Sequence, residues 1–228
     1  MKMVKLTSVL KRFSRDNQMN VLFKDMNFQV TEGELVVISG EPQTGKSTLL
    51  KMIAAMTPPN KGKVEVLGED LLHIKERPQW RLNNIGFITH EGCLIPYMTV
   101  KQNLLLGSVE TDPDYNFKEE KATSILYALG FSKETINETI EGLTSKEQIL
   151  ATIARIFMTN PRIILADEPT KALTGTEGSE VLENLLRFAR EQGSTVIVVS
   201  NDNNIINIAD RLFLLENCQL LEQREAIS

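Results

Sequence analysis

Alternating apolar and polar residues near the N-terminus give way further along to short apolar runs. Residues 3–9 and 21–30 alternate and predict strands that bury one face. The run at 35–39 is almost wholly apolar, which is typical of a strand buried on both faces. Further strands are predicted at 63–70 with its turn, 84–89, 162–167, 195–200 and 211–216.

Helical periodicity separates these strands. It predicts helices at 46–56, 177–190 and 205–209. Residues 90–160 show mostly helical spacing, and we expect a separate helical lobe there. The apolar faces that define these helices are Ala122, Ile125, Leu126 and Leu129; Ile149, Ile153, Ile156 and Phe157; and Val181, Leu182, Leu185, Leu186 and Ala189.

Buried strands that alternate with helices predict an α/β fold with a mostly parallel sheet and helices on both of its faces. The alternating N-terminal strands fit a smaller antiparallel sheet beside it. We therefore predict a single domain over 1–228. Its core and β subdomain come from 1–89 and 161–228, and its helical subdomain from 90–160.

Composition limits the cellular compartment and the classes of partner that we expect. The net charge of −5 gives no indication of a nucleic-acid partner. Cys93 and Cys218 are too few and too far apart for a disulfide framework, so we expect a reducing cytosol. The N-terminus lacks the apolar core of a signal peptide, and no apolar run approaches the length of a membrane span. Any membrane association would then come through a partner.

A glycine-bearing loop links the predicted strand at 35–39 to the following helix. Its sequence, "GEPQTGKST", fits the phosphate-loop pattern G-x-x-x-x-G-K-[ST]. The backbone amides of such a loop cradle phosphate oxygens, the lysine offers a charge to the β- and γ-phosphates, and the serine hydroxyl ligates Mg²⁺. The predicted nucleotide-binding residues here are Gly40, Gln43, Thr44, Gly45, Lys46, Ser47 and Thr48.

An acidic pair ends the predicted strand at 162–167. Asp167 is placed to hold Mg²⁺ together with Ser47. The adjacent Glu168 is the candidate general base that orients or deprotonates the attacking water. Together with the phosphate loop, the pair predicts an enzyme that binds and hydrolyses ATP.

Over nearly its whole length the chain resembles the nucleotide-binding subunit of an ATP-binding-cassette (ABC) transporter. The resemblance rests on "GKSTLL", "GKVEVLGEDL", "MTVKQNLLL", "ADEPT" and "VVSNDNN", in that order. Within the family, "RLNNIGFITHEGCLIPYMTVKQNL" is most similar to the group that serves lipoprotein release, macrolide export and cell division.

The resemblance implies a P-loop NTPase core that binds MgATP at a dimer interface. The two cassettes, identical or different, would pack head to tail, with ATP between the phosphate loop of one and the signature helix of the other. A transmembrane subunit would hold the dimer at the inner face of the cell membrane. Phe13 matches the family's aromatic residue that stacks on adenine.

Four positions depart from the family pattern. His90 replaces a glutamine that senses Mg²⁺ and the transmembrane partner, and it remains a candidate metal ligand. Thr174 replaces an aspartate, and Asn201 replaces the histidine that contacts the γ-phosphate. In the signature segment, Thr144, Ser145 and Lys146 stand where the family has a serine and two glycines.

These departures predict tight ATP binding with slow hydrolysis. Side chains at Ser145 and Lys146 occupy space where backbone amides should approach the γ-phosphate. Asn201 keeps a hydrogen-bond donor but cannot become a cation. Two alternatives stay open: a nucleotide-responsive structural module with little turnover, and the degenerate half of an asymmetric heterodimer. A P-loop kinase or GTPase fits the spacing least.

Overall fold

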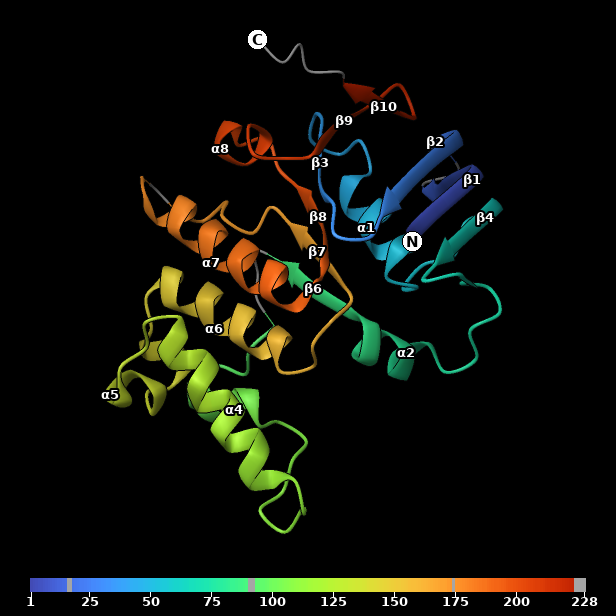
Figure 1. The fold of residues 1–228 in the computed structure, drawn as a ribbon. Coiled ribbons are helices and arrows are strands. Elements are labelled where there is room, and N and C mark those ends of the chain that lie inside the picture. Colours follow the sequence, from blue (N-terminus) through green and yellow to red (C-terminus); the bar gives the residue numbers. More distant parts are fainter. Residues whose placement is uncertain (16–17, 90–92, 174, 224–228) are drawn as a thin grey trace.

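The computed structural model describes residues 1–15, 18–89, 93–173 and 175–223. Two sheets form its framework (Figure 1). The antiparallel sheet has the order β2 (Gln18–Thr31), β1 (Lys2–Arg15), β4 (Lys61–Val66) and β5 (Glu69–Asp70). The larger sheet has the order β10 (Gln219–Gln223), β9 (Arg211–Glu216), β3 (Leu35–Ser39), β8 (Thr195–Val199), β7 (Ile163–Asp167) and β6 (Ile85–Thr89).

The larger sheet is parallel from β9 to β6, and only β10 pairs with its neighbour in antiparallel fashion. Its register places Thr89 opposite Asp167, and Asp167 opposite Val199. Because parallel strands all end at the same edge, the segments that follow β3, β6, β7 and β8 emerge side by side. The predicted fold class is therefore confirmed.

Helices cover both faces of the larger sheet (Figure 1). α1 (Lys46–Ile53) and the antiparallel sheet pack on one face, where Val36 and Ile38 point. α6 (Ser145–Phe157) and α7 (Glu177–Gln192) pack on the other, where Val37 points. The remaining helices are α2 (Arg77–Asn84), α3 (Val100–Leu104), α4 (Tyr115–Ala128), α5 (Lys133–Ile136), the 3₁₀ turn η1 (Ile140–Gly142) and α8 (Asn203–Ile206).

The helices α3 to α6 all fall within the segment predicted to be helical, and the residues that define their predicted apolar faces are buried. They share one apolar cluster with Val37 and Ile88 of the larger sheet. The division into subdomains at residue 90 remains a prediction, since His90 lies outside the described residues. Within the described ranges, no helix is long and apolar enough to cross a membrane.

Several element boundaries differ from the prediction. The last short helix begins at Asn203 and ends at Ile206, because Asp202 caps it by accepting a hydrogen bond from the Asn204 amide at 2.9 Å. α1 stops at Ile53, since the chain turns through Ala55 at a φ of +55°. The sequence pattern also missed α2 and β10. α2 buries mainly Trp80, whose ring nitrogen donates to Glu69, so it lacks an apolar stripe.

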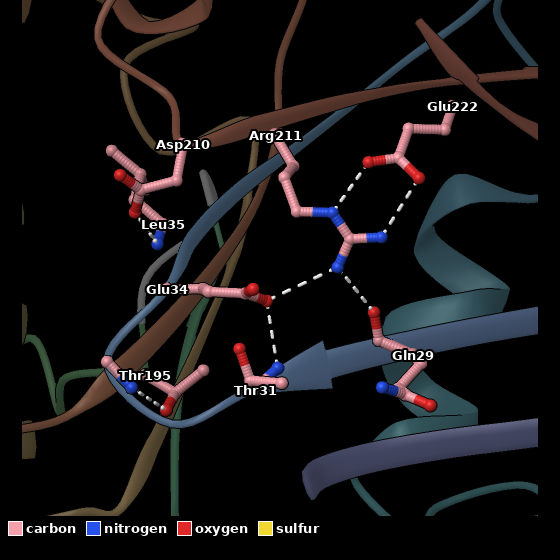
Figure 2. Close-up of polar contacts among 9 residues, drawn as sticks. Gln29, Thr31, Glu34, Leu35, Thr195, Asp210, Arg211 and Glu222 are labelled. Atoms are coloured by element: carbon pink, nitrogen blue, oxygen red, sulfur yellow. Dashed lines mark hydrogen bonds and ion pairs between the residues drawn. The ribbon is translucent and has the colours of Figure 1, made fainter. Parts of the chain in front are cut away.

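Arg211 at the start of β9 joins the two sheets at the edge opposite the phosphate loop (Figure 2). Its guanidinium forms a bidentate ion pair with Glu222 of β10, at 2.6 and 3.0 Å. It also donates to the carbonyl of Gln29 at 2.9 Å and lies 3.4 Å from Glu34. Glu34 in turn accepts the amide of Thr31 at 2.8 Å. The network fixes the connection between β2 and β3.

Candidate nucleotide-binding and catalytic site

The phosphate loop leaves β3 at Ser39 and enters α1 at Lys46. Gly40 has a φ of +146°, and a Cβ built on it would lie 2.6 Å from the carbonyl oxygen of Leu215 in β9. Gly45, the N-cap of α1, has a φ of +106° and faces the ring of Phe23 in β2. The loop path therefore requires glycine at Gly40 for two reasons, its backbone angle and the neighbouring backbone.

The Lys46 side chain folds back and hydrogen-bonds to the backbone of this loop. Its ammonium donates to the carbonyl oxygens of Gly40 at 2.6 Å and Glu41 at 2.8 Å, and the residue is only 6% exposed. Burial lowers the pKa of Lys46 below its ordinary value, while the charges of Glu168 and Asp167 act in the opposite direction. Lys46 is thus a buried cation on which the charges of the acidic pair act.

The start of α1 is suited to an anion. No side chain caps it at Gly45, and the first amides of any helix have no partner within that helix. Ser47 and Thr48 lie half-buried in this first turn. Gln43 is exposed with a φ of +66°, and the Thr44 hydroxyl donates to the Glu41 carbonyl at 2.9 Å. Thr44 therefore supports the shape of the loop.

Asp167 and Glu168 follow at the carboxyl end of β7, the strand that α1 packs against. The backbone of Glu168 has a φ of +46°, and its amide donates to Val199 of β8 at 2.9 Å. Its carboxylate forms an ion pair with Lys171 at 3.0 Å. The fold thus brings both carboxylates to the edge of the sheet where Lys46 lies.

Asn201 lies beside the first residue of the loop. Its side-chain oxygen accepts the Gly40 amide at 3.1 Å, and its side-chain nitrogen donates to the Gly40 carbonyl at 3.3 Å. The segment after β8 is thereby tied to the segment after β3. In this arrangement both ends of the amide are used to hold the loop.

Phe13 lies on β1, and its side chain is accessible, with 46% of the residue exposed. The ammonium of Lys11 lies 4.7 Å from the centre of the Phe13 ring. Lys11 itself donates to the Thr57 hydroxyl at 2.8 Å and the Pro58 carbonyl at 2.6 Å. These contacts fix a cation against Phe13.

Of the other predicted positions, His90 and Thr174 lie outside the described residues.

The altered signature segment forms a well-capped helix start. Thr144 caps α6 and exchanges hydrogen bonds with Glu147 in a capping box. Lys146 forms an ion pair with Glu180 of α7. This hydrogen bond raises the pKa of Lys146, and the charges of Glu180, Glu177 and Glu147 act in the same direction. Within this chain, the tip of α6 therefore carries a charged lysine whose charge is balanced by the acidic groups around it.

Comparison with known proteins agrees with this arrangement. Residues 23–171 match the sequence pattern of the ABC transporter family. This chain belongs to the ABC transporter family. It is 33% identical to the ABC transporter ATP-binding protein YtrE of Bacillus subtilis, over 89% of this chain and 88% of that protein. It is 32% identical to the lipoprotein-releasing system ATP-binding protein LolD of Rickettsia bellii, over 95% and 96%.

A solved structure gives the same fold. The dimeric, post-hydrolysis structure of the ATP-binding cassette MJ0796, bound to ADP and phosphate, superposes with a TM-score of 0.87 at 29% sequence identity. The match covers 97% of this chain and 98% of MJ0796. The predicted family and the predicted fold, a P-loop NTPase core with an antiparallel sheet, are confirmed.

The donor set of this cassette fits Mg²⁺ that is bound together with a nucleotide. Among the residues the structure describes, no three His, Cys, Asp or Glu side chains gather as a metal cage. Mg²⁺ is usually held by one or two protein oxygens together with substrate phosphates and water. Ser47 and Asp167 offer oxygens of that kind, on elements that pack together.

Sequence reasoning passed over two lysines of this site. Lys171 pairs with the candidate base, and Lys11 lies against Phe13. The only local signal for Lys171 was a basic residue three positions after a glutamate. For Lys11 no local signal exists, because its partners Thr57 and Pro58 come from a distant turn.

Proposed function

We propose that this chain is the ATP-binding subunit of a membrane ABC transporter complex and that it hydrolyses MgATP slowly. The observation that carries the proposal is the position of Lys46, Asp167 and Glu168 at one edge of the larger sheet. The names of YtrE and LolD, both ATP-binding proteins of such systems, support it. So does the bound ADP and phosphate of MJ0796.

Each site residue has a proposed role. The amides of Gly40 to Thr48 bind the phosphates, and Lys46 exchanges its loop carbonyls for β- and γ-phosphate oxygens. Ser47 and Asp167 hold Mg²⁺, with His90 as a further candidate ligand. When bound, the metal supplies positive charge that offsets the negative charge on the phosphate oxygens.

The remaining roles concern the adenine ring of the nucleotide and the attacking water. Phe13 stacks on adenine through its accessible ring. Glu168 accepts the proton of the attacking water. Asn201 contributes through Gly40, because its amide is committed to that residue.

Slow turnover follows from two of the departures. Asn201 supplies no cation for the transition state, and losing one such stabilising contact lowers a rate by a factor on the order of a hundred. Lys146 must also leave Glu180 before it can meet another chain's nucleotide. We therefore propose a cassette that binds ATP well and turns it over slowly.

The partners follow from the family. We propose that the chain pairs with a second cassette, identical or different, and with a transmembrane subunit at the inner face of the membrane. Dimeric MJ0796 supports the pairing of cassettes. A structural module with little turnover is the second candidate, and the commitment of Asn201 to the loop is the observation that favours it.

The test is steady-state ATP turnover of the purified chain, alone and with the products of neighbouring genes. Wild type should hydrolyse ATP slowly, Glu168→Gln should bind ATP without hydrolysis, and Lys46→Ala should lose binding. Turnover in Glu168→Gln equal to wild type would remove Glu168 from its role. Binding without any wild-type turnover would favour the structural module.

A further inference from the structure

Lys171 forms an ion pair with the candidate base. Its ammonium lies 3.0 Å from Oε2 of Glu168, and its amide donates to the Glu168 carbonyl at 3.2 Å, so a tight turn holds the two together. In the part of the chain that the structure describes, no other side chain forms an ion pair or hydrogen bond with this carboxylate. The Glu168 backbone is fixed in turn by its hydrogen bond to Val199. Lys171 is therefore in a position to direct this carboxylate.

The pair is placed to affect the reaction. The Lys171 side chain is 61% exposed and that of Glu168 is 30% exposed, so both reach the accessible edge of the site. The charge of Lys171 also reaches Lys46, whose pKa it lowers in addition to the larger effect of burial. The charge of Lys171 therefore acts on the lysine of the phosphate loop as well as on the candidate base.

A general base must offer a carboxylate lone pair to the water that it deprotonates. A lysine on that carboxylate occupies one oxygen and competes with the water for it. We propose that Lys171 is a positioning residue that holds Glu168 away from the attacking water and thereby slows ATP hydrolysis. This inference rests on the proposed function, since it concerns the rate at the same site.

The expected size of the effect is modest. Exposed ion pairs contribute at most ~1 kcal/mol, which corresponds to a factor of about five in rate. Removing the lysine should then raise kcat by up to about fivefold. Because the pair involves the base and not the bound phosphates, KM for ATP should stay within about twofold of wild type.

The experiment measures kcat and KM for ATP in the full chain. Lys171→Met removes the charge and keeps the length, Lys171→Arg restores the charge, and Lys118→Met serves as the matched control. Lys118 pairs with Asp114 at 2.8 Å on the surface of α4, away from the site. Binding of a fluorescent ATP analogue reports that each variant is folded.

We expect a higher kcat in Lys171→Met, wild-type values in Lys171→Arg and Lys118→Met, and no effect of Lys171→Met in the Glu168→Gln background. If wild type shows no turnover, the proposal requires turnover to appear in Lys171→Met, and its absence there overturns the proposal. An unchanged or lower kcat also overturns it, and a raised KM would make Lys171 a phosphate ligand instead. Hydrolysis by Glu168→Gln at the wild-type rate would overturn the proposed function separately.

Discussion

Gly40 is the position where the structure makes the sharpest prediction about the nucleotide site. In Gly40→Ala the new Cβ would lie 2.6 Å from the Leu215 carbonyl, on a backbone with a φ of +146°. The strained backbone costs about 1–3 kcal/mol, and a clash with a backbone atom adds about 1–3 kcal/mol, because neither strand can move freely. Together these costs predict a loss of about 2–6 kcal/mol, or a fall in Tm of about 4–24 °C.

Gly193→Ala is the matched control. Gly193 ends α7 with a φ of +68°, but nothing lies within 4 Å of the position that its Cβ would take. This variant should lose only about 1–2 kcal/mol, from backbone strain alone. The difference between the two variants reports the contact with Leu215 together with the difference in backbone strain.

Thermal unfolding and ATP titration check both parts of this reasoning. Since the Gly40 carbonyl accepts the Lys46 ammonium, displacing Gly40 should also weaken ATP binding at least tenfold, whereas Gly193→Ala should bind normally. Equal losses of stability in the two variants, or normal ATP affinity in Gly40→Ala, would refute the account of the loop.

Three further predictions test other parts of the molecule. Phe13→Ala should raise the Kd for ATP about tenfold and leave the affinity for inorganic triphosphate unchanged, because the lost contact is stacking on the base; an equal effect on both ligands in a calorimetric titration would remove the stacking role. Thr144→Ala should lower the free energy of unfolding by about 1 kcal/mol through loss of the α6 cap, as should Thr99→Ala, which removes the matching cap of α3; denaturation midpoints that do not move would argue against both caps. Burial acts to raise the pKa of Glu34, but the hydrogen bonds from Thr31 and the charge of Arg211 outweigh it and hold the pKa below its ordinary value. A carboxyl whose pKa is lowered by folding stabilises the fold above its unfolded pKa, and this contribution is lost as the pH falls through the folded pKa. Glu34→Gln should therefore destabilise at pH 7 and have much less effect at pH 3, and equal effects at both pH values in urea denaturation would contradict the Arg211 network.

Local patterns in the sequence were sufficient for the framework of the fold. Short apolar runs predicted the parallel strands of the larger sheet, and a nine-residue segment, Gly40 to Thr48, predicted the phosphate loop. Where the local signal was weak the prediction failed. α2 buries little apart from Trp80, and β10 is polar at most positions.

Two contacts at the unusual positions are long-range and left no trace in local patterns. Asn201 and Gly40 are 161 positions apart, and Lys146 and Glu180 are 34 apart. Both pairs form only because parallel strands and packed helices bring their ends together. Sequence comparison identified Asn201 and Lys146 as unusual, but only the fold shows which partners they take.

A single-turnover experiment shows whether Glu168 drives slow hydrolysis of bound ATP. Wild type and Glu168→Gln, each as the full chain, are mixed with Mg²⁺ and with less than one equivalent of labelled ATP. The release of labelled phosphate is then followed for both proteins. The account predicts slow but complete release by wild type and none by Glu168→Gln, with both proteins binding the nucleotide. Release at the same rate from both proteins, or from neither, would contradict it.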